Sequence, residues 1–376
     1  MGKYNVKYDE KEFLKELQYL VNTDSGTGYI AGIEEIADFF KKKYERLGLC
    51  VDMKTFDPKY GPCIEVKSHP DEKEIDLLMI CHMDTVFPVG TVVQRPFYII
   101  EDQAFGPGIA DSKSGALLIT AIIENLRLYR PDLKVCVAMN CDNEIGAPSS
   151  RSWIWELARN AKYCFGFEAG RQDGSFVDER KGAAFYHIKM YGKSTHAGID
   201  PRGGASAVLE MANWICRFAD YDRLPLGTSL NFGVVQGGTQ YNVIPDYAES
   251  KVDARFETEE QYRIVNEEIY DLCKNPYNPE ITVTVDIISK SVPMNRNERS
   301  DELIRIMEKE AELQNSDIRF TSTGGVGDAN IASSAGAGTV DGCGVVGSYL
   351  HSPKERIRIS SIKERLELLV NVCMKI

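Results

Sequence analysis

Histidine and acidic side chains at a few widely separated positions could together bind metal ions. His82 directly follows the continuous apolar run 75–81, which is typical of a strand buried on both faces. Ligands of open α/β sheets bind beyond the carboxyl ends of the strands, and an imidazole placed there can bind a cation through one ring nitrogen. Asp84 follows two residues later, where its carboxylate could orient the ring. Taken alone, this His-x-Asp pattern is also what a polar strand end looks like.

Asp111 is a second candidate ligand. It lies in the glycine-rich segment 106–115, directly before a long apolar helix expected over 114–129. A carboxylate at this point could bridge two cations through its two oxygens. The alternative for the segment is a nucleotide-binding loop. It fails the dinucleotide fingerprint, because Asp111 stands where the third glycine belongs, and this disfavours a nucleotide-binding oxidoreductase.

Three further candidates follow other strand-like runs or a glycine-rich stretch. Glu144 ends the segment after the apolar run 135–141, and Glu168 follows the run 163–167. His351 comes after the glycine-rich stretch 324–347. Each alone is as readily a solvated surface group. Because the carboxyl ends of parallel strands meet at one sheet edge, Glu144 and Glu168 are expected to converge there with His82 and Asp111. Together with His351, these residues make a complete ligand set for two metal ions.

The elements that must position these residues alternate between strands and helices. Buried strands are expected over 75–81, 135–141 and 163–167, and helices over 33–47 and 114–129. Such alternation predicts a doubly wound α/β layer.

The middle of the chain has another order: strand, helix, strand, strand, helix, strand. The expected segments are 185–190, 205–219, 229–235, 249–256, 259–273 and 281–289. This is the split-βαβ, or ferredoxin-like, pattern. It predicts an inserted domain over 182–293 that interrupts a catalytic domain formed by 1–181 and 294–376.

The composition is that of a soluble globular protein. The 376 residues are 43% hydrophobic and 27% charged, with a formal net charge of −12. An acidic balance without a basic block disfavours nucleic acid and anionic membrane as partners. The N-terminus lacks the apolar segment of a signal peptide, and no run is long enough to span a membrane. The 10 cysteines are irregularly spaced, which fits buried free thiols better than a disulfide framework. We therefore expect a cytoplasmic protein.

Eight motifs in order make the chain resemble a known family, the aminoacylase and carboxypeptidase-G family of dizinc metallopeptidases. Tripeptidases and succinyl-diaminopimelate desuccinylase are relatives of that family. The resemblance covers roughly residues 10–375. The motifs are His82-x-Asp84, the segment 106–115, the acidic strand end 142–144, Glu168, the segment 192–198, the segment 242–245, the segment 324–329 and His351-Ser352.

The resemblance implies an α/β catalytic domain with an inserted ferredoxin-like lid, which usually dimerises. Two divalent metal ions, with zinc as the expected metal, would be held at the site. His82 and Glu168 would hold one ion, Glu144 and His351 the other, and Asp111 would bridge them. A bridging water would be the nucleophile. A glutamate at position 168, rather than an aspartate, resembles members that cut C-terminal or N-acyl amino-acid bonds.

The resemblance also implies roles for residues of the lid and of the glycine-rich segment 324–329. His196, often supplied by the partner subunit, would stabilise the developing oxyanion. Asn242, Arg255 and Gly325 would bind substrate, with Arg255 gripping a carboxylate. The peptide bond after Asp111 would be cis. A homodimer through the lid and a small peptide or N-acyl amino-acid substrate follow from the same resemblance.

Position 143 departs from the family pattern. There the pattern has a glutamate that acts as general base, next to the ligand glutamate; this chain has Asn143. A neutral amide does not accept a proton from water near neutral pH, and positioned general bases contribute roughly 10²–10⁴-fold. Asp142 is not expected to replace it, since neighbouring side chains of a strand point to opposite faces.

Three explanations for Asn143 stay open: a natural non-hydrolytic relative, a substitution made to trap a complex, and an altered mechanism. Two functions follow. The first is metal-dependent hydrolysis of an amide or peptide bond in a small substrate with a free carboxylate, impaired at the general-base position. The second is a metal-binding pseudoenzyme that binds such ligands without cleaving them. Cys81 and Cys141, which flank candidate ligands, are interpreted as small apolar fillers rather than zinc ligands.

Overall fold

The computed structural model describes residues 4–219 and 224–376, which form two compact units. The first comprises the chain up to Glu179 together with Met294–Thr323 and Gly327–Ile376; the second comprises Arg180–Pro293 with Gly324–Val326. The candidate metal ligands all belong to the first unit.

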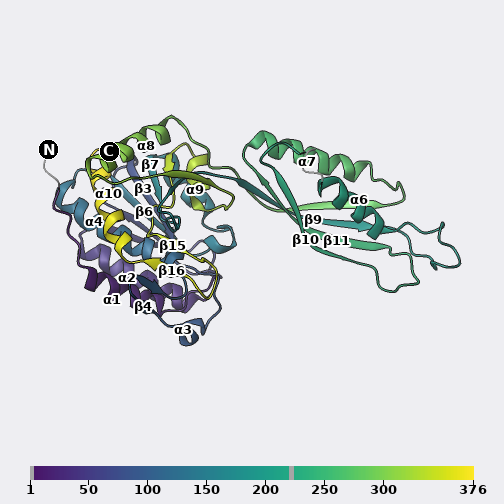
Figure 1. Ribbon diagram of the computed structural model, residues 1–376, viewed down its shortest axis with the longest axis horizontal. Helices are drawn as coiled ribbons and strands as arrows, with labels where there is room; N and C mark the ends of the chain where they lie inside the picture. The colour runs from purple at the N-terminus through teal and green to yellow at the C-terminus, as the bar shows by residue number, and fades with distance from the viewer. Residues whose placement is uncertain (1–3, 220–223) are drawn as a thin grey trace. The chain divides into compact units, whose positions relative to one another are not determined.

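A six-stranded sheet forms the centre of the first unit (Figure 1). Its spatial order is β1 (Cys50–Lys54), β2 (Cys63–Lys67), β6 (Val135–Asn140), β3 (Ile75–His82), β7 (Ala161–Gly166) and β14 (Gly338–Val340). β3 pairs in parallel with both β6 and β7, and β14 pairs in parallel with β7. The carboxyl ends of these strands therefore share one edge of the sheet, as the α/β prediction requires.

Helices flank this sheet (Figure 1). The longer ones are α1 (Glu10–Val21), α2 (Ile30–Arg46), α4 (Ser114–Tyr129), α5 (Arg151–Arg159), α8 (Glu298–Leu313) and α10 (Ser360–Cys373), with short helices α3 (Thr91–Gln94) and α9 (Asp328–Ser334). α1 begins after Asp9, whose side chain accepts a hydrogen bond from the N–H of Glu12 and so caps the helix.

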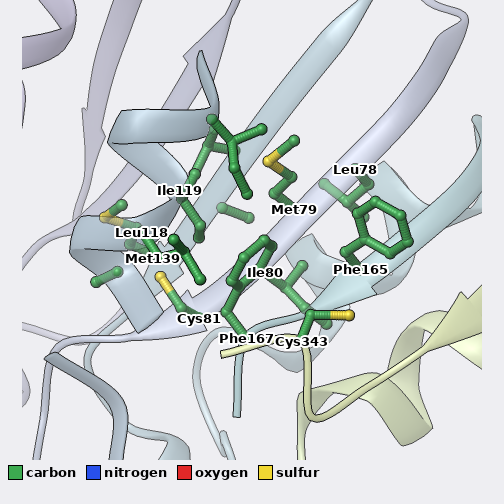
Figure 2. Close-up of a cluster of buried hydrophobic side chains, with 14 of the residues drawn as sticks. Leu78, Met79, Ile80, Cys81, Leu118, Ile119, Met139, Phe165, Phe167 and Cys343 are labelled. Atoms are coloured by element: carbon green, nitrogen blue, oxygen red, sulfur yellow. The ribbon is translucent and has the colours of Figure 1, made fainter. Parts of the chain in front are cut away.

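The core of the first unit lies between β3 and the elements packed on its two faces. In Figure 2, Met79 of β3 points toward Ile119 of α4, and the same cluster contains Leu78 of β3 and Phe165 of the neighbouring strand β7. All four side chains are fully buried. Since successive side chains of a strand alternate between faces, a strand buried on both sides must be apolar throughout. This explains the apolar run 77–81 that directly precedes His82.

Smaller strands complete the first unit. β15 (Gly347–Ser348), β16 (Arg356–Arg358), β5 (Gln103–Phe105) and β4 (Tyr98–Ile100) form a second sheet in that order. β13 (Phe320–Thr323) pairs with β8 (Phe176–Arg180). The pairing of β16 with β5 brings the segment after His351 next to the segment before Asp111, two stretches far apart in the sequence.

The second unit has the predicted βαββαβ order. Its elements are β9 (Gly182–Tyr191), α6 (Ala207–Ala219), β10 (Ser229–Gly237), β11 (Tyr247–Phe256), α7 (Glu259–Lys274) and β12 (Thr282–Ser291). The strands form an antiparallel sheet in the order β10-β11-β9-β12. Trp214 and Phe218 of α6 and Ile269 of α7 are buried in a core separate from that of the first unit. Among the described residues, no helix is long and apolar enough to cross a membrane.

Candidate metal centre

The carboxylate of Asp111 lies between two imidazoles. Its Oδ1 is 2.9 Å from Nε2 of His82, and its Oδ2 is 3.0 Å from Nε2 of His351. Asp111 sits in the short turn Ile109–Lys113 that leads into α4, and its peptide bond to Ser112 is cis, as predicted. Gly108 opens this turn with φ of 70°, and a Cβ there would come within 2.5 Å of Thr85. Glycine is therefore required for the close approach of the two segments.

Each imidazole also faces one of the remaining candidate ligands. Nε2 of His82 is 3.8 Å from Oε1 of Glu168, and Nε2 of His351 is 3.3 Å from Oε2 of Glu144. The structure thus brings together all five predicted ligands, with Asp111 between the two pairs. His351 has φ of 58°, a conformation uncommon outside glycine and frequent at functional sites.

The residues present fit divalent metal ions. Ligand atoms of His82, Asp111 and Glu144 all lie within 4.8 Å of one another. Oε1 of Glu144 is buried without a hydrogen-bond partner, and a buried carboxylate oxygen left in this way is costly unless a cation or donor meets it. Imidazole and carboxylate donors suit zinc and similar divalent ions.

Asp84 links the His82 ring to the loop that carries Glu144. Nδ1 of His82 is 2.9 Å from the backbone oxygen of Asp84 and 3.3 Å from its Oδ1. The fully buried Asp84 carboxylate also accepts hydrogen bonds from the N–H groups of Asn143 and Glu144, both at 3.2 Å, and from the Thr27 hydroxyl at 2.7 Å. This arrangement directs Nε2 of His82 toward Asp111, which is the geometry that a ligand-orienting carboxylate provides.

The protonation of the cluster reflects its dense charge. Burial by itself would lower the pKa of His82, but the carboxylates of Asp111 and Asp84 outweigh burial and raise it well above the usual range. Hydrogen bonds to Asp111 and Glu144 raise the pKa of His351 to about 10. Burial would raise the pKa of Asp111, yet the two imidazoles hold it far below its usual value. Without a cation, the site is therefore held together by imidazolium–carboxylate pairs.

Asn143 lies beside a buried acid that the sequence analysis did not identify as functional. Its Nδ2 donates a 2.7 Å hydrogen bond to Oδ2 of Asp328, the first residue of α9. Burial raises the pKa of Asp328 to about 6, although the hydrogen bond from Asn143 opposes this shift. The motif 324–329 contains Asp328, but no local pattern indicates a partner 185 positions away.

The Asp142 side chain is held by hydrogen bonds to other residues. The strand geometry that the sequence predicted is not what keeps it from replacing the base. The strand was predicted to continue to residue 141, but β6 ends at Asn140, so strand alternation does not apply to Asp142. Instead its buried Oδ2 accepts hydrogen bonds from the N–H and the hydroxyl of Ser149, both at 2.7 Å. Cys81 and Cys141 are buried free thiols, and burial raises the pKa of the Cys81 thiol.

Two loops of the second unit carry His196 and Asn242. His196 is exposed, and its Nδ1 accepts a hydrogen bond from the N–H of Gly198 at 3.1 Å. The N–H of Ala197 donates to the backbone oxygen of Asn242 at 2.9 Å, and His196 forms a β-bridge with Val243. The His196 loop and the Asn242 loop therefore lie side by side.

Arg255 and Gly325, both predicted to bind substrate, also belong to the second unit. The Arg255 guanidinium forms a two-pronged pair with Asp253, at 2.8 and 2.9 Å, and donates to the backbone oxygen of Gly324 at 3.3 Å. The backbone oxygen of Gly325 accepts a hydrogen bond from Arg180 at 3.0 Å. The carboxylate that Arg255 grips in this structure is thus an internal one.

Comparison with known proteins shows similarity along the whole chain. Residues 178–281 match the family described as the peptidase dimerisation domain. Carboxypeptidase G2 of Pseudomonas sp. (strain RS-16) is 28% identical over 374 residues, covering 97% of this chain and 89% of that protein. The uncharacterized protein YqjE of Bacillus subtilis is 24% identical over 383 residues, covering 97% of this chain and 98% of that protein.

Solved structures share the fold. Aminopeptidase PepT from Bacillus cereus superposes with a TM-score of 0.80 at 23% identity, covering 98% of both chains. An M20 family metallo-carboxypeptidase from Sulfolobus solfataricus superposes with a TM-score of 0.75 at 17% identity, covering 96% of this chain and 98% of that one.

Proposed function

We propose that this chain, a homologue of carboxypeptidase G2 with the fold of the M20 metallopeptidases, is a metal-dependent hydrolase of small peptides or N-acyl amino acids with a free carboxylate. Its homologues and structural neighbours are metallopeptidases. The observation that carries the proposal is the position of Asp111, with one carboxylate oxygen on His82 and the other on His351. A carboxylate shared in this way between two imidazole–glutamate pairs is suited to bridge two cations.

Two zinc ions are the proposed metals. His82 and Glu168 would hold one, Glu144 and His351 the other, and Asp111 would contact both. When bound, such a pair polarises the scissile carbonyl and lowers the pKa of water. Asp84 would keep His82 in the tautomer that presents Nε2, because its own backbone oxygen and carboxylate meet Nδ1.

The second unit would supply the groups that hold the substrate. Arg255 would bind the substrate carboxylate, with the pair to Asp253 orienting its guanidinium. His196, exposed on its loop, would stabilise the negative charge that develops on the attacked carbonyl oxygen. Asn242 and Gly325 would add hydrogen bonds to the substrate.

We further propose a homodimer through the second unit, with His196 donated to the partner's metal site. The match to the peptidase dimerisation domain supports this assembly.

A cytoplasmic location is proposed on the free thiols, since all 10 cysteines are unpaired and disulfides are rare in that compartment.

Asn143 would make this hydrolase slow. Its amide donates to Asp328 and has no lone pair basic enough to take a proton from water. We therefore expect metal and substrate binding to persist while proton removal is impaired.

The second candidate function is a pseudoenzyme that binds peptide-like ligands. It is favoured by the same observation, the amide of Asn143 at the position of the general base.

A panel of dipeptides and N-acyl amino acids, incubated with zinc-loaded protein and followed for product by mass spectrometry, tests the proposal. The control variant is Glu144→Ala. Hydrolysis that the control abolishes would support the hydrolase; binding of the same compounds without any product over days would support the pseudoenzyme.

A further inference from the structure

Glu355 forms a bridge between the two loops that carry Asp111 and His351. It is 2% exposed, lies four residues after His351, and directly precedes β16. Its Oε1 accepts hydrogen bonds from the N–H groups of Ala110 at 2.9 Å and Asp111 at 3.1 Å. Its Oε2 accepts one from the N–H of Gly108 at 3.2 Å. Both oxygens of one buried side chain are thus directed at the turn that presents the bridging carboxylate.

The backbone places Glu355 for this role. Its carbonyl oxygen accepts from the N–H of Gly106 at 3.5 Å, and the next residue, Arg356, pairs with Phe105 across β16 and β5. Directly beside the β16–β5 pairing, the Glu355 side chain therefore continues the contact with hydrogen bonds to the segment 106–111. Gly108 has φ of 70°, and the buried N–H groups of Gly108, Ala110 and Asp111 need an acceptor, which the Glu355 carboxylate supplies.

We propose that Glu355 is a positioning residue that fixes the Asp111 turn, and with it the bridging carboxylate, before any metal binds. The inference deepens the proposed metal site and rests on it. Asp111 must direct its two oxygens at two different imidazoles, 2.9 and 3.0 Å away, and a turn free to rotate would not hold both. Because Glu355 is only four residues from His351, its bonds to the Asp111 turn also fix the separation between the loop of Asp111 and the loop of His351.

The informative variant is Glu355→Gln, which keeps the size of the side chain. A glutamine side chain has only one oxygen. That oxygen can accept from Ala110 and Asp111, or from Gly108, but not from all three. The NH₂ group takes the place of the second oxygen, so the N–H group that it faces is left without an acceptor. Loss of a ligand-orienting residue typically lowers metal affinity about 10–100-fold. Glu310→Gln is a matched control, because Glu310 is also a buried glutamate, 6% exposed, but lies on α8 and pairs with Lys375 at 4.0 Å.

Two measurements on the full chain test the proposal. In the metal-free protein, hydrogen exchange of the amides of Gly108, Ala110 and Asp111 should be accelerated at least about 10-fold in Glu355→Gln and unchanged in Glu310→Gln. In zinc titrations against a competing chelator, Glu355→Gln should bind about 10–100-fold more weakly than the unmodified protein. The variant should keep the circular dichroism spectrum of the parent.

The outcomes separate this proposal from the proposed function. Unchanged amide exchange in Glu355→Gln would overturn the positioning role, whether or not zinc binds. Accelerated exchange with unchanged zinc affinity would also overturn it, because the fixed turn would then not matter for the metal. If the unmodified protein fails to bind zinc at all, the proposed function fails, while the exchange experiment still decides whether Glu355 holds the turn.

Discussion

The side-chain amide of Asn143 donates from Nδ2 to Oδ2 of Asp328 across 2.7 Å. Because a carboxylate can only accept here, the pair fixes the orientation of the amide: the NH₂ group faces Asp328 and the other polar atom is the acceptor Oδ1. Position 143 can therefore accept a hydrogen bond from a water or substrate without taking its proton. This is the structural basis for expecting binding with slow hydrolysis.

Replacing Asp328 with asparagine should stabilise the metal-free protein at neutral pH. Burial raises the pKa of Asp328 from 3.8 to about 6. The folded state therefore disfavours the charged form, and this cost develops as the pH rises from about 4 to about 6 and is complete above. Asp328→Asn can still accept from Asn143 but carries no charge. At pH 7.5 we expect its free energy of unfolding to exceed that of the parent by about 1–3 kcal/mol.

Urea denaturation at pH 7.5 and at pH 4.5 measures this effect. The advantage of Asp328→Asn should shrink at pH 4.5, where Asp328 is protonated in the folded parent. Asp317→Asn, at an exposed aspartate on the same unit, should show no such difference. An advantage that is equal at both pH values, or a destabilised variant at pH 7.5, would contradict the raised pKa of Asp328.

Zinc affinity should rise with pH. His351 has a pKa of about 10 in the metal-free protein, and the pKa of His82 is raised as well, so at pH 7 both imidazoles hold protons that a metal must displace. Each displaced proton changes the apparent affinity by about tenfold per pH unit. We expect affinity to fall by about one to two decades per unit between pH 8 and pH 6. Chelator competition measures it; an affinity independent of pH would rule out these imidazoles as ligands.

The bridging role of Asp111 predicts a specific loss of metal. Asp111→Asn removes the charge and replaces one oxygen with NH₂, so one of the two contacts must fail. The zinc content after equilibrium dialysis should drop from two ions per chain to one or none, whereas Asp132→Asn, an exposed aspartate paired with Arg130, should keep both. Two tightly bound ions in Asp111→Asn would show that Asp111 does not bridge.

The proposed donation of His196 across a dimer can be tested by mixing subunits. Two inactive variants are made in the Asn143→Glu background, one carrying His196→Ala and the other Glu144→Ala. If His196 serves the partner's site, the mixed dimer contains one site with both groups intact. Activity should then recover to about a quarter of the Asn143→Glu parent in an equimolar random mixture. Recovery near zero, with mixed dimers verified by mass spectrometry, would place His196 at its own subunit's site or outside catalysis.

The sequence was sufficient to predict which residues gather at the sheet edge. His82 ends one buried strand and Glu168 follows another, and the apolar runs before them make those strand ends visible without a structure. The order of elements in the second unit was also predictable, because Ala207–Ala219 and Glu259–Lys274 bury one helical face each. Helix α5 was missed because it is only nine residues long, too short for its apolar period to stand out.

The contacts that tune the site could not be predicted in the same way. Asp328 meets Asn143 across 185 positions, and Glu355 meets Gly108 across 247. Neither pairing leaves a local pattern, since an acid in a glycine-rich or polar loop is usually solvated. The strand argument about Asp142 was wrong because the chain leaves β6 at Asn140, and strand ends are among the least certain features of a sequence-based assignment.

A kinetic comparison of the unmodified protein with Asn143→Glu tests whether Asn143 is what limits proton removal from water. Zinc-loaded proteins are assayed on the most responsive dipeptide or N-acyl amino acid, with Asn143→Gln as a neutral control of the same length as glutamate. We expect slow turnover by the unmodified protein, no gain for Asn143→Gln, and a kcat increase of about 10²–10⁴-fold for Asn143→Glu with KM little changed. An unmodified protein that already turns over at about 10 s⁻¹, typical of enzymes, would contradict this expectation, since position 143 would then not be where the proton is taken.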